Sequence, residues 1–291
     1  MDKKSIVSHK GPARIGTGLC LFITMSLAAS LIPGSDGSSE IFPAGMIVRM
    51  AAQCIALLSA YYVIIHGVGN ETPRIEVTKG QAICLIPVSL AAFAVYYLSS
   101  GAVAAVMHEL DIDLLKTTDA PEGAFGTALY FLHYVVLTPI LEELLFRRAL
   151  FAASEGYSKL FAVMMSSVFF ALSHWQISRL VPVFLFSLII GYAYAKTGSL
   201  LYTILIHSIN NLLVFADLYI DKDRVPWLPW SIPSIASAAG IICLICLVVG
   251  SVPAGIDPEW CDGDGIKSFF TWPVIAALSA YLVILVMSFG G

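Results

Sequence analysis

One stretch of this chain places two carboxylates and two guanidinium groups inside a long apolar run. It reads Thr-Pro-Ile-Leu-Glu-Glu-Leu-Leu-Phe-Arg-Arg over residues 138–148. Ionisable side chains are costly inside a membrane-spanning segment and commonly mark a functional site there. Residues four apart share one face of a helix, so Glu143 and Arg147 are placed to form an ion pair, while Glu142 lies about 100° away. We therefore expect Glu143 to be engaged by Arg147 and Glu142 not to be.

Two later apolar segments carry a histidine and a partner four residues away. Phe170 precedes His174, and His207 precedes Asn211. This spacing directs His207 and Asn211 toward one point beside their helix. Counted from the cytoplasmic loops, Glu142, His174 and His207 lie about 20, 22 and 16 Å deep at a rise of about 1.5 Å per residue. The three side chains are expected to share one plane near the middle of the membrane.

These residue types suit the hydrolysis of a peptide bond. The reaction needs a base to activate water, an acid for the leaving amine and donors for the developing oxyanion. Glu142 and His174 can position and deprotonate a water molecule, and His207 and Asn211 can donate hydrogen bonds to the oxyanion. We expect this chemistry to proceed without a metal.

A zinc-dependent reaction is the main alternative mechanism, with Glu142, His174 and His207 as candidate ligands. Against zinc, the sequence has no His-Glu-x-x-His motif, and asparagine is a poor zinc ligand. No cofactor is therefore expected, with zinc as the alternative. Serine chemistry is disfavoured because Ser173 and His174 are sequence neighbours and point to different helix faces.

Simpler explanations fit each residue taken singly. A lone histidine in a membrane helix is more often a hydrogen-bonding residue between helices than a catalyst. Glu143 and Arg147 are more simply a structural ion pair, and Phe170 is more simply a packing residue. A proton-coupled transporter would use midplane carboxylates, but we find the polar cluster in one half of the chain only. A non-catalytic immunity or scaffold protein is the remaining alternative.

Composition requires that most of the chain lies in a membrane. Of its 291 residues, 58% are hydrophobic and 12% are charged, which is too little polar surface to coat a water-soluble globule. A membrane-spanning helix needs about 20 predominantly apolar residues. The sequence predicts an all-α, polytopic transmembrane bundle of about nine spans, at residues 15–33, 44–66, 81–106, 125–152, 159–177, 180–196, 199–220, 231–252 and 268–289.

The lysines and arginines beside these spans indicate the orientation, because cytoplasmic loops carry an excess of both. Nine of them fall on the side of the N-terminus and four on the opposite side. The N-terminus is therefore expected in the cytoplasm. An odd number of spans then places the C-terminus outside.

The ordered motifs resemble those of the CAAX protease and bacteriocin-processing family, whose type II CAAX prenyl endopeptidases share the pattern. The motifs are EExxxR from Glu142 and Glu143 to Arg147, FxxxH from Phe170 to His174, and HxxxN from His207 to Asn211. The resemblance covers about residues 125–220 and implies the same catalytic and supporting roles. It also implies an eight-helix core, which the expected span count exceeds by one.

The resemblance implies an intramembrane endopeptidase whose substrates are membrane-embedded or lipid-tethered peptides, with prenylated CAAX-type peptides as one class. We expect one membrane domain in three parts: residues 1–124 with three helices, the catalytic core at 125–220, and C-terminal helices at 221–291. The expected partners are membrane lipid and the peptide substrate, with no nucleic acid. The expected location is the plasma membrane of a prokaryote.

Overall fold

A computed structural model describes residues 10–31, 42–66, 75–112, 123–219, 232–251 and 266–287. Within these ranges the regular structure is helical and includes no β-strand. The separate helices are α1 (Lys10–Ser30), α2 (Phe42–Ile65), α3 (Lys79–Glu109), α7 (Lys159–Leu172), α8 (Ile177–Thr197), α9 (Leu200–Tyr219), α10 (Ile232–Ser251), the short 3-10 helix η6 (Ile266–Phe269) and α11 (Trp272–Met287).

One further helix, from residue 123 to residue 154, changes its winding along its length. It consists of α4 (Gly123–Phe131), the π-helix η2 (Leu132–Leu137), α5 (Thr138–Glu143), the π-helix η3 (Leu144–Phe151) and α6 (Ala152–Ser154). π-Helical turns are rare and occur often at functional sites. The apolar pattern predicts the helix but does not predict its two π-helical stretches.

The chain is an all-helical, multi-pass integral membrane protein. Within the described residues, six helices are long and apolar enough to cross a membrane: Gly11–Ser30, Gly45–Ile65, Lys79–Glu109, Gly123–Ser154, Ile177–Thr197 and Leu200–Tyr219. Shorter apolar helices lie at Lys159–Leu172, Pro233–Ile245 and Trp272–Ile284. A helix thus occurs at each expected position, while the count of nine crossings stays a prediction. The terminal residues 1–9 and 288–291 lie outside the described residues, and the expected orientation stays a prediction.

The helices group into two compact units. Unit 1 comprises Met1–Pro73, Leu141–Gln176 and Asp257–Gly291, and unit 2 comprises Arg74–Ile140 and Ile177–Ile256. The chain passes from unit 2 to unit 1 within α5. Both units draw on residues 125–220, so they interleave the three predicted parts of the chain, and that predicted division stays a prediction.

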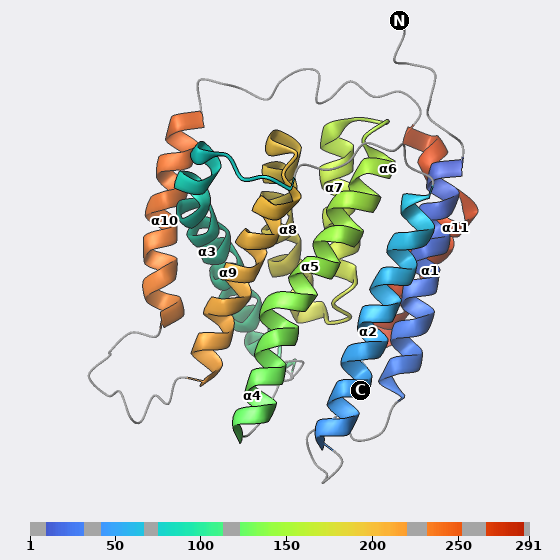
Figure 1. Cartoon of the computed structure of the whole chain (residues 1–291), viewed down its shortest axis with the longest axis horizontal. Helices are drawn as coiled ribbons and strands as arrows, with labels where there is room; N and C mark the ends of the chain where they lie inside the picture. The colour runs from blue at the N-terminus through green and yellow to red at the C-terminus, as the bar shows by residue number, and fades with distance from the viewer. Residues whose placement is uncertain are drawn as a thin grey trace, which may run out of the picture. The chain divides into compact units, whose positions relative to one another are not determined.

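In unit 1, α1 packs beside α2 and α11 (Figure 1), and η3 packs against α2 and α7. The approach of α1 to α11 depends on Gly16, because a Cβ atom at this position would overlap the backbone of Pro273. Small residues allow helix backbones in a membrane to touch in this way. The close contact sets the position of α11 along α1.

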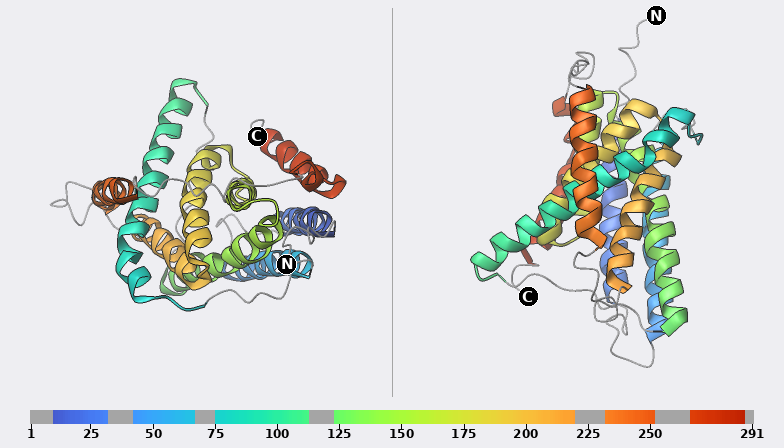
Figure 2. Two further views of the ribbon diagram at one scale, coloured as in Figure 1. Left: turned by 90° about the horizontal axis from the view of Figure 1, so that it is seen from above. Right: turned by 90° about the vertical axis from the view of Figure 1, so that its left-hand side faces the viewer.

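In unit 2, α3 packs against α8, α9 and α10, and α10 crosses α3 closely (Figures 1 and 2). A Cβ atom at Gly240 of α10 would overlap the carbonyl oxygen of Leu90 in α3. The N-terminus of α3 is closed by a capping box, in which Gln81 N donates to Thr78 Oγ1 at 3.3 Å and Thr78 N donates to Gln81 Oε1 at 2.8 Å. These contacts hold the helices that carry the unit 2 motif.

The predicted span at 159–177 is wrong at its C-terminal end, because α7 ends at Leu172. Two side chains close this end: Ser173 Oγ donates to Phe170 O at 2.7 Å, and His174 Nδ1 bonds the same oxygen at 2.9 Å. Trp175 then adopts a positive φ of 57°, which an α-helix does not allow. His174 therefore lies in a turn after the helix rather than on its face.

Candidate active site

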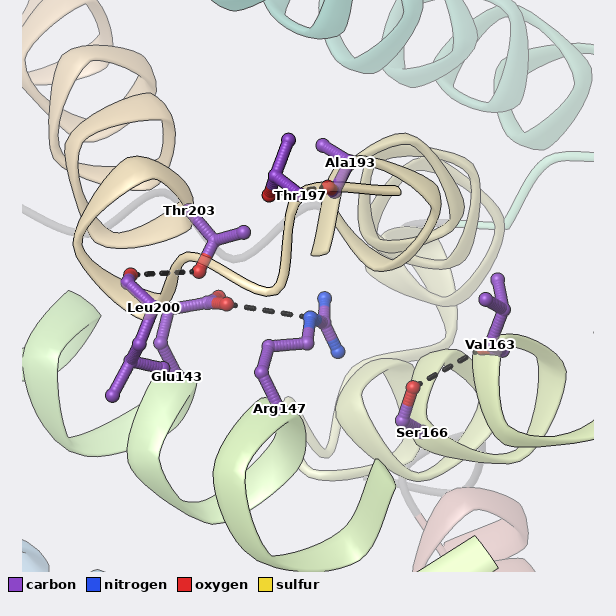
Figure 3. Close-up of polar contacts among 8 residues, drawn as sticks. All are labelled: Glu143, Arg147, Val163, Ser166, Ala193, Thr197, Leu200 and Thr203. Atoms are coloured by element: carbon purple, nitrogen blue, oxygen red, sulfur yellow. Dashed lines mark hydrogen bonds and ion pairs between the residues drawn. The ribbon is translucent and has the colours of Figure 1, made fainter. Parts of the chain in front are cut away.

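The predicted ion pair between Glu143 and Arg147 is present in unit 1. Arg147 Nε lies 3.3 Å from Glu143 Oε2, and both side chains are 0% exposed (Figure 3). The four-residue spacing brings the groups together although η3 begins directly after Glu143. A fully buried pair of this kind is costly to break, because removing one partner leaves a buried charge.

Glu142 precedes this pair at the end of α5. Its side chain is only 7% exposed, although its helical position differs by one residue from that of Glu143. The two adjacent carboxylates are therefore both buried. Glu143 is engaged by Arg147.

Phe170 of α7 connects the ion pair to His174. Its ring meets Phe146 edge to face at 5.2 Å, and the guanidinium carbon of Arg147 lies 5.3 Å from its centroid. The His174 ring is 5.1 Å from the same phenyl ring. A cation within about 6 Å of an aromatic face is attracted to it. The Phe170 ring thus contacts both Arg147 and His174, and the supporting role of Phe170 stays a prediction.

The hydrogen bond of His174 determines which nitrogen carries its proton. Nδ1 lies 2.9 Å from the carbonyl oxygen of Phe170, and a carbonyl oxygen can only accept. Nδ1 must therefore donate, and in the neutral imidazole Nε2 then bears the lone pair. A histidine held in this state can accept a proton, or bind a metal, through Nε2.

In unit 2, His207 and Asn211 are both buried on α9, at 3% and 5% exposure. The rings of His207 and of Phe186 from α8 are in a T-shaped arrangement, with their centroids 5.5 Å apart. Asn211 Nδ2 donates to the carbonyl oxygen of Tyr134 at 2.9 Å, and Asn210 Nδ2 donates to Asn211 Oδ1 at 3.2 Å. The two bonds orient the Asn211 amide. Since an amide nitrogen has two hydrogens, one remains for another acceptor.

A proline explains why Tyr134 O takes a side-chain donor. In η2 the backbone bonds run from residue i to residue i−5, as Thr138 N shows by donating to His133 O. The next donor in this pattern would be Pro139, which has no N–H group. Asn211 supplies the donor in its place. Sequence reasoning missed Asn210, Tyr134 and Pro139, although the Asn-Asn pair and the proline inside an apolar run were visible signals.

The structure thus divides the predicted site residues between the two units. Glu142, Glu143, Arg147, Phe170 and His174 lie in unit 1, and His207 and Asn211 lie in unit 2. Contacts within unit 1 join the EExxxR and FxxxH motifs, and contacts within unit 2 orient the HxxxN motif. The shared plane of all these residues stays a prediction.

In the described residues, neither unit gathers three or more His, Cys, Asp and Glu side chains that could hold a metal ion. The zinc alternative draws Glu142 and His174 from unit 1 and His207 from unit 2. It therefore stays an alternative to the expected metal-free reaction.

Comparison with known proteins identifies one segment of the chain. Residues 124–213 match the family model described as type II CAAX prenyl endopeptidase Rce1-like. No curated protein and no solved structure matches the chain. The matched segment includes all three motifs and both π-helical stretches. This match over residues 124–213 confirms the resemblance to the CAAX proteases drawn from the motifs.

Proposed function

We propose that this protein is an intramembrane endopeptidase in which Glu142 and His174 activate water, and His207 and Asn211 stabilise the oxyanion. The observation that carries the proposal is the match to a prenyl endopeptidase model over the one segment that contains every motif residue. The contacts within each unit add to this support, because they orient His174 and Asn211 through backbone carbonyl oxygens.

In the proposed reaction, the Glu142 carboxylate takes a proton from a water molecule as the water oxygen attacks the scissile carbonyl carbon. The new C–O bond forms while the carbonyl π electrons move onto the oxygen. His174, with its proton on Nδ1, accepts a hydrogen bond from the same water through Nε2. When the C–N bond breaks, the proton held by Glu142 passes to the leaving amine.

The proposed role of the unit 2 motif is to donate hydrogen bonds to the oxyanion. The second hydrogen of Asn211 Nδ2 and a ring N–H of His207 would donate to it, as preorganised donors do in other peptide hydrolases. The proposal requires both units to serve one substrate. Glu143 and Arg147 take no proton in this scheme, and their buried pair holds the segment that carries Glu142.

The proposed substrate is a membrane-embedded or lipid-tethered peptide, with a prenylated CAAX-type C-terminus as the leading class. Purified full-length protein in lipid nanodiscs should cleave a farnesylated CAAX-type peptide faster than the same peptide without the lipid. Glu142→Gln protein serves as the blank. Equal cleavage of both peptides would contradict the proposed preference for prenylated peptides. If neither peptide is cleaved, nor any member of a membrane-peptide library, the endopeptidase proposal is contradicted. The non-catalytic and transporter alternatives would then be favoured.

The zinc version of the reaction is separated from the metal-free version by elemental analysis. The metal-free proposal predicts that activity survives chelation and that no stoichiometric zinc accompanies the protein. The metal version predicts one zinc per chain, loss of that zinc in His207→Ala, and activity that chelation removes and added zinc restores. These results would make Glu142 either a zinc ligand or the base that acts on metal-bound water.

We also propose nine crossings, a cytoplasmic N-terminus and a location in a prokaryotic plasma membrane. Gly16 of α1 faces Pro273 of α11, and six to eight residues later Phe22 and Tyr281 both contact Trp175, so the two helices run in the same direction. Helices that run in the same direction are separated by an odd number of crossings, which supports an odd total. Labelling of single cysteines at the two ends of the chain should find them on opposite sides, and labelling on the same side would contradict the count.

A further inference from the structure

The turn that carries His174 is strained at the residue that follows it. Trp175 has a φ of 57°, in the left-handed region that bulky residues rarely adopt. Such a conformation persists only where the surrounding structure holds it. Trp175 N still donates to Leu172 O at 3.2 Å, and His174 N donates to Ala171 O at 3.2 Å. The backbone therefore winds tightly through both residues, and a rotation at Trp175 would be passed to His174.

Two aromatic rings from the ends of the chain hold the Trp175 ring. Phe22 of α1 stacks on it at 6.1 Å with an interplanar angle of 23°, and Tyr281 of α11 contacts it at 5.1 Å. Both Phe22 and Tyr281 are buried, and Tyr281 also meets Phe169 of α7 at 6.4 Å. We name the set of Phe22, Trp175 and Tyr281 the aromatic clamp.

The contact between α1 and α11 holds Phe22 and Tyr281 against the Trp175 ring. At Gly16 the two backbones touch through Pro273, and Cys20 Sγ lies 3.8 Å from Pro273 O. These contacts lie on the same two helices as Phe22 and Tyr281. The spacing of the two clamping rings is thus determined by helices outside residues 124–213, the segment that matches the family model.

We infer that Trp175 is a positioning residue for His174 and that the aromatic clamp selects the turn over a continued helix. This inference rests on the proposed function, because it gives the turn its purpose. If Trp175 returned to helical φ and ψ, α7 would extend past Leu172, and the His174 ring would leave the position in which Nδ1 donates to Phe170 O. The terminal helices, which carry no motif, would then act in catalysis by holding the histidine.

The test compares Tyr281→Leu and Phe22→Leu, which remove a clamping ring, with Tyr281→Phe, which keeps it. Tyr281→Phe is a matched control because the Tyr281 hydroxyl has no hydrogen-bond partner among the described residues. The two leucine variants should lower kcat about 10- to 100-fold with little change in KM, since a small misplacement of a catalytic group costs this much. Trp175→Ala should do the same, and Trp175→Phe should recover most of the loss. A kcat at the wild-type level in both leucine variants would overturn the inference.

A second measurement does not depend on peptidase activity. Diethyl pyrocarbonate modifies accessible imidazole nitrogens, and mass spectrometry reports its rate at His174 in folded, monodisperse protein. The rate should rise several-fold in Tyr281→Leu and Phe22→Leu and stay at the wild-type value in Tyr281→Phe. Equal rates in all four proteins would overturn the inference. If the rate rises in the leucine variants but the wild-type protein cleaves no peptide, the proposed function is refuted and the inference about the aromatic clamp stands.

Discussion

His174 in unit 1 and Asn211 in unit 2 are oriented by the same kind of contact, but over very different sequence distances. His174 Nδ1 bonds the carbonyl oxygen of Phe170, four residues earlier on the same helix end. Asn211 Nδ2 bonds the carbonyl oxygen of Tyr134, 77 residues earlier, on another helix. In both cases a backbone oxygen near an irregular part of a helix accepts from a site side chain. Irregular helix geometry therefore supplies the acceptors that hold this site.

The two units differ in the charge that they bury. Unit 1 holds a fully buried ion pair and a cation over an aromatic ring, whereas the described contacts of His207, Asn210 and Asn211 in unit 2 involve rings and amides. A buried charge without its partner is much more costly than an amide without one. Substitutions in the buried ion pair of unit 1 should therefore affect stability as well as activity, and those of Asn211 in unit 2 should affect mainly activity.

The largest effect is expected from Glu142→Gln. The amide keeps the shape of the side chain and cannot accept the proton of water, so kcat should fall by about two to four orders of magnitude while the protein stays folded. Peptide cleavage tests the expected loss of kcat, and thermal unfolding of the same preparation tests whether the protein stays folded. Glu155→Gln, at an exposed position of the same unit, is the matched control. Wild-type turnover in Glu142→Gln would refute the assignment of the base.

The next largest effect on activity is expected from Asn211→Ala. Removal of an oxyanion donor typically lowers kcat by about 10²- to 10³-fold. KM should change little, because the oxyanion exists only in the transition state. Steady-state kinetics on the cleaved peptide separate the two constants. A raised KM with normal kcat would instead make Asn211 a substrate-binding residue.

Stability is the main readout for the buried ion pair. Arg147→Ala and Glu143→Ala should each lower the free energy of unfolding by about 3 to 5 kcal/mol, because each leaves one charge buried without its partner. The double variant Glu143→Gln with Arg147→Met should recover much of that loss, since no charge remains. Denaturant unfolding in mild detergent measures all three. Normal stability in both single variants would show that the pair has no structural role.

The smallest effect on kcat is expected from a change that weakens the hydrogen bond between Asn211 and Tyr134 O. Pro139→Ala restores an N–H group that competes for Tyr134 O and so weakens the bond to Asn211. One hydrogen bond is worth about 1 kcal/mol, which corresponds to about a fivefold loss in kcat. Pro87→Ala, inside α3 of the same unit, is the matched control. A loss of equal size in both variants would point to a general effect on helix packing.

Much of unit 1 could be predicted because its contacts are local. The spacing of Glu143 and Arg147 indicates their ion pair, and the spacing of Phe170 and His174 brings their rings together. The end of α7 could not be predicted, because no glycine or proline follows Leu172 before Pro182. Helix propensity is weak beside the packing of Trp175 against Phe22 and Tyr281, which lie far away in the sequence.

The sequence by itself determined that the chain is a helical membrane protein, which of its side chains can do chemistry, and the pairs that lie four residues apart. Only the tertiary structure decided that His174 sits in a turn, that Asn211 of α9 donates to the carbonyl oxygen of Tyr134, and that the motifs are divided between two units. The physical reason is the range of the interactions. Helical periodicity is a local property of the backbone, whereas the side-chain donor that reaches a carbonyl, and the conformation of a strained residue, depend on which distant side chain is packed there.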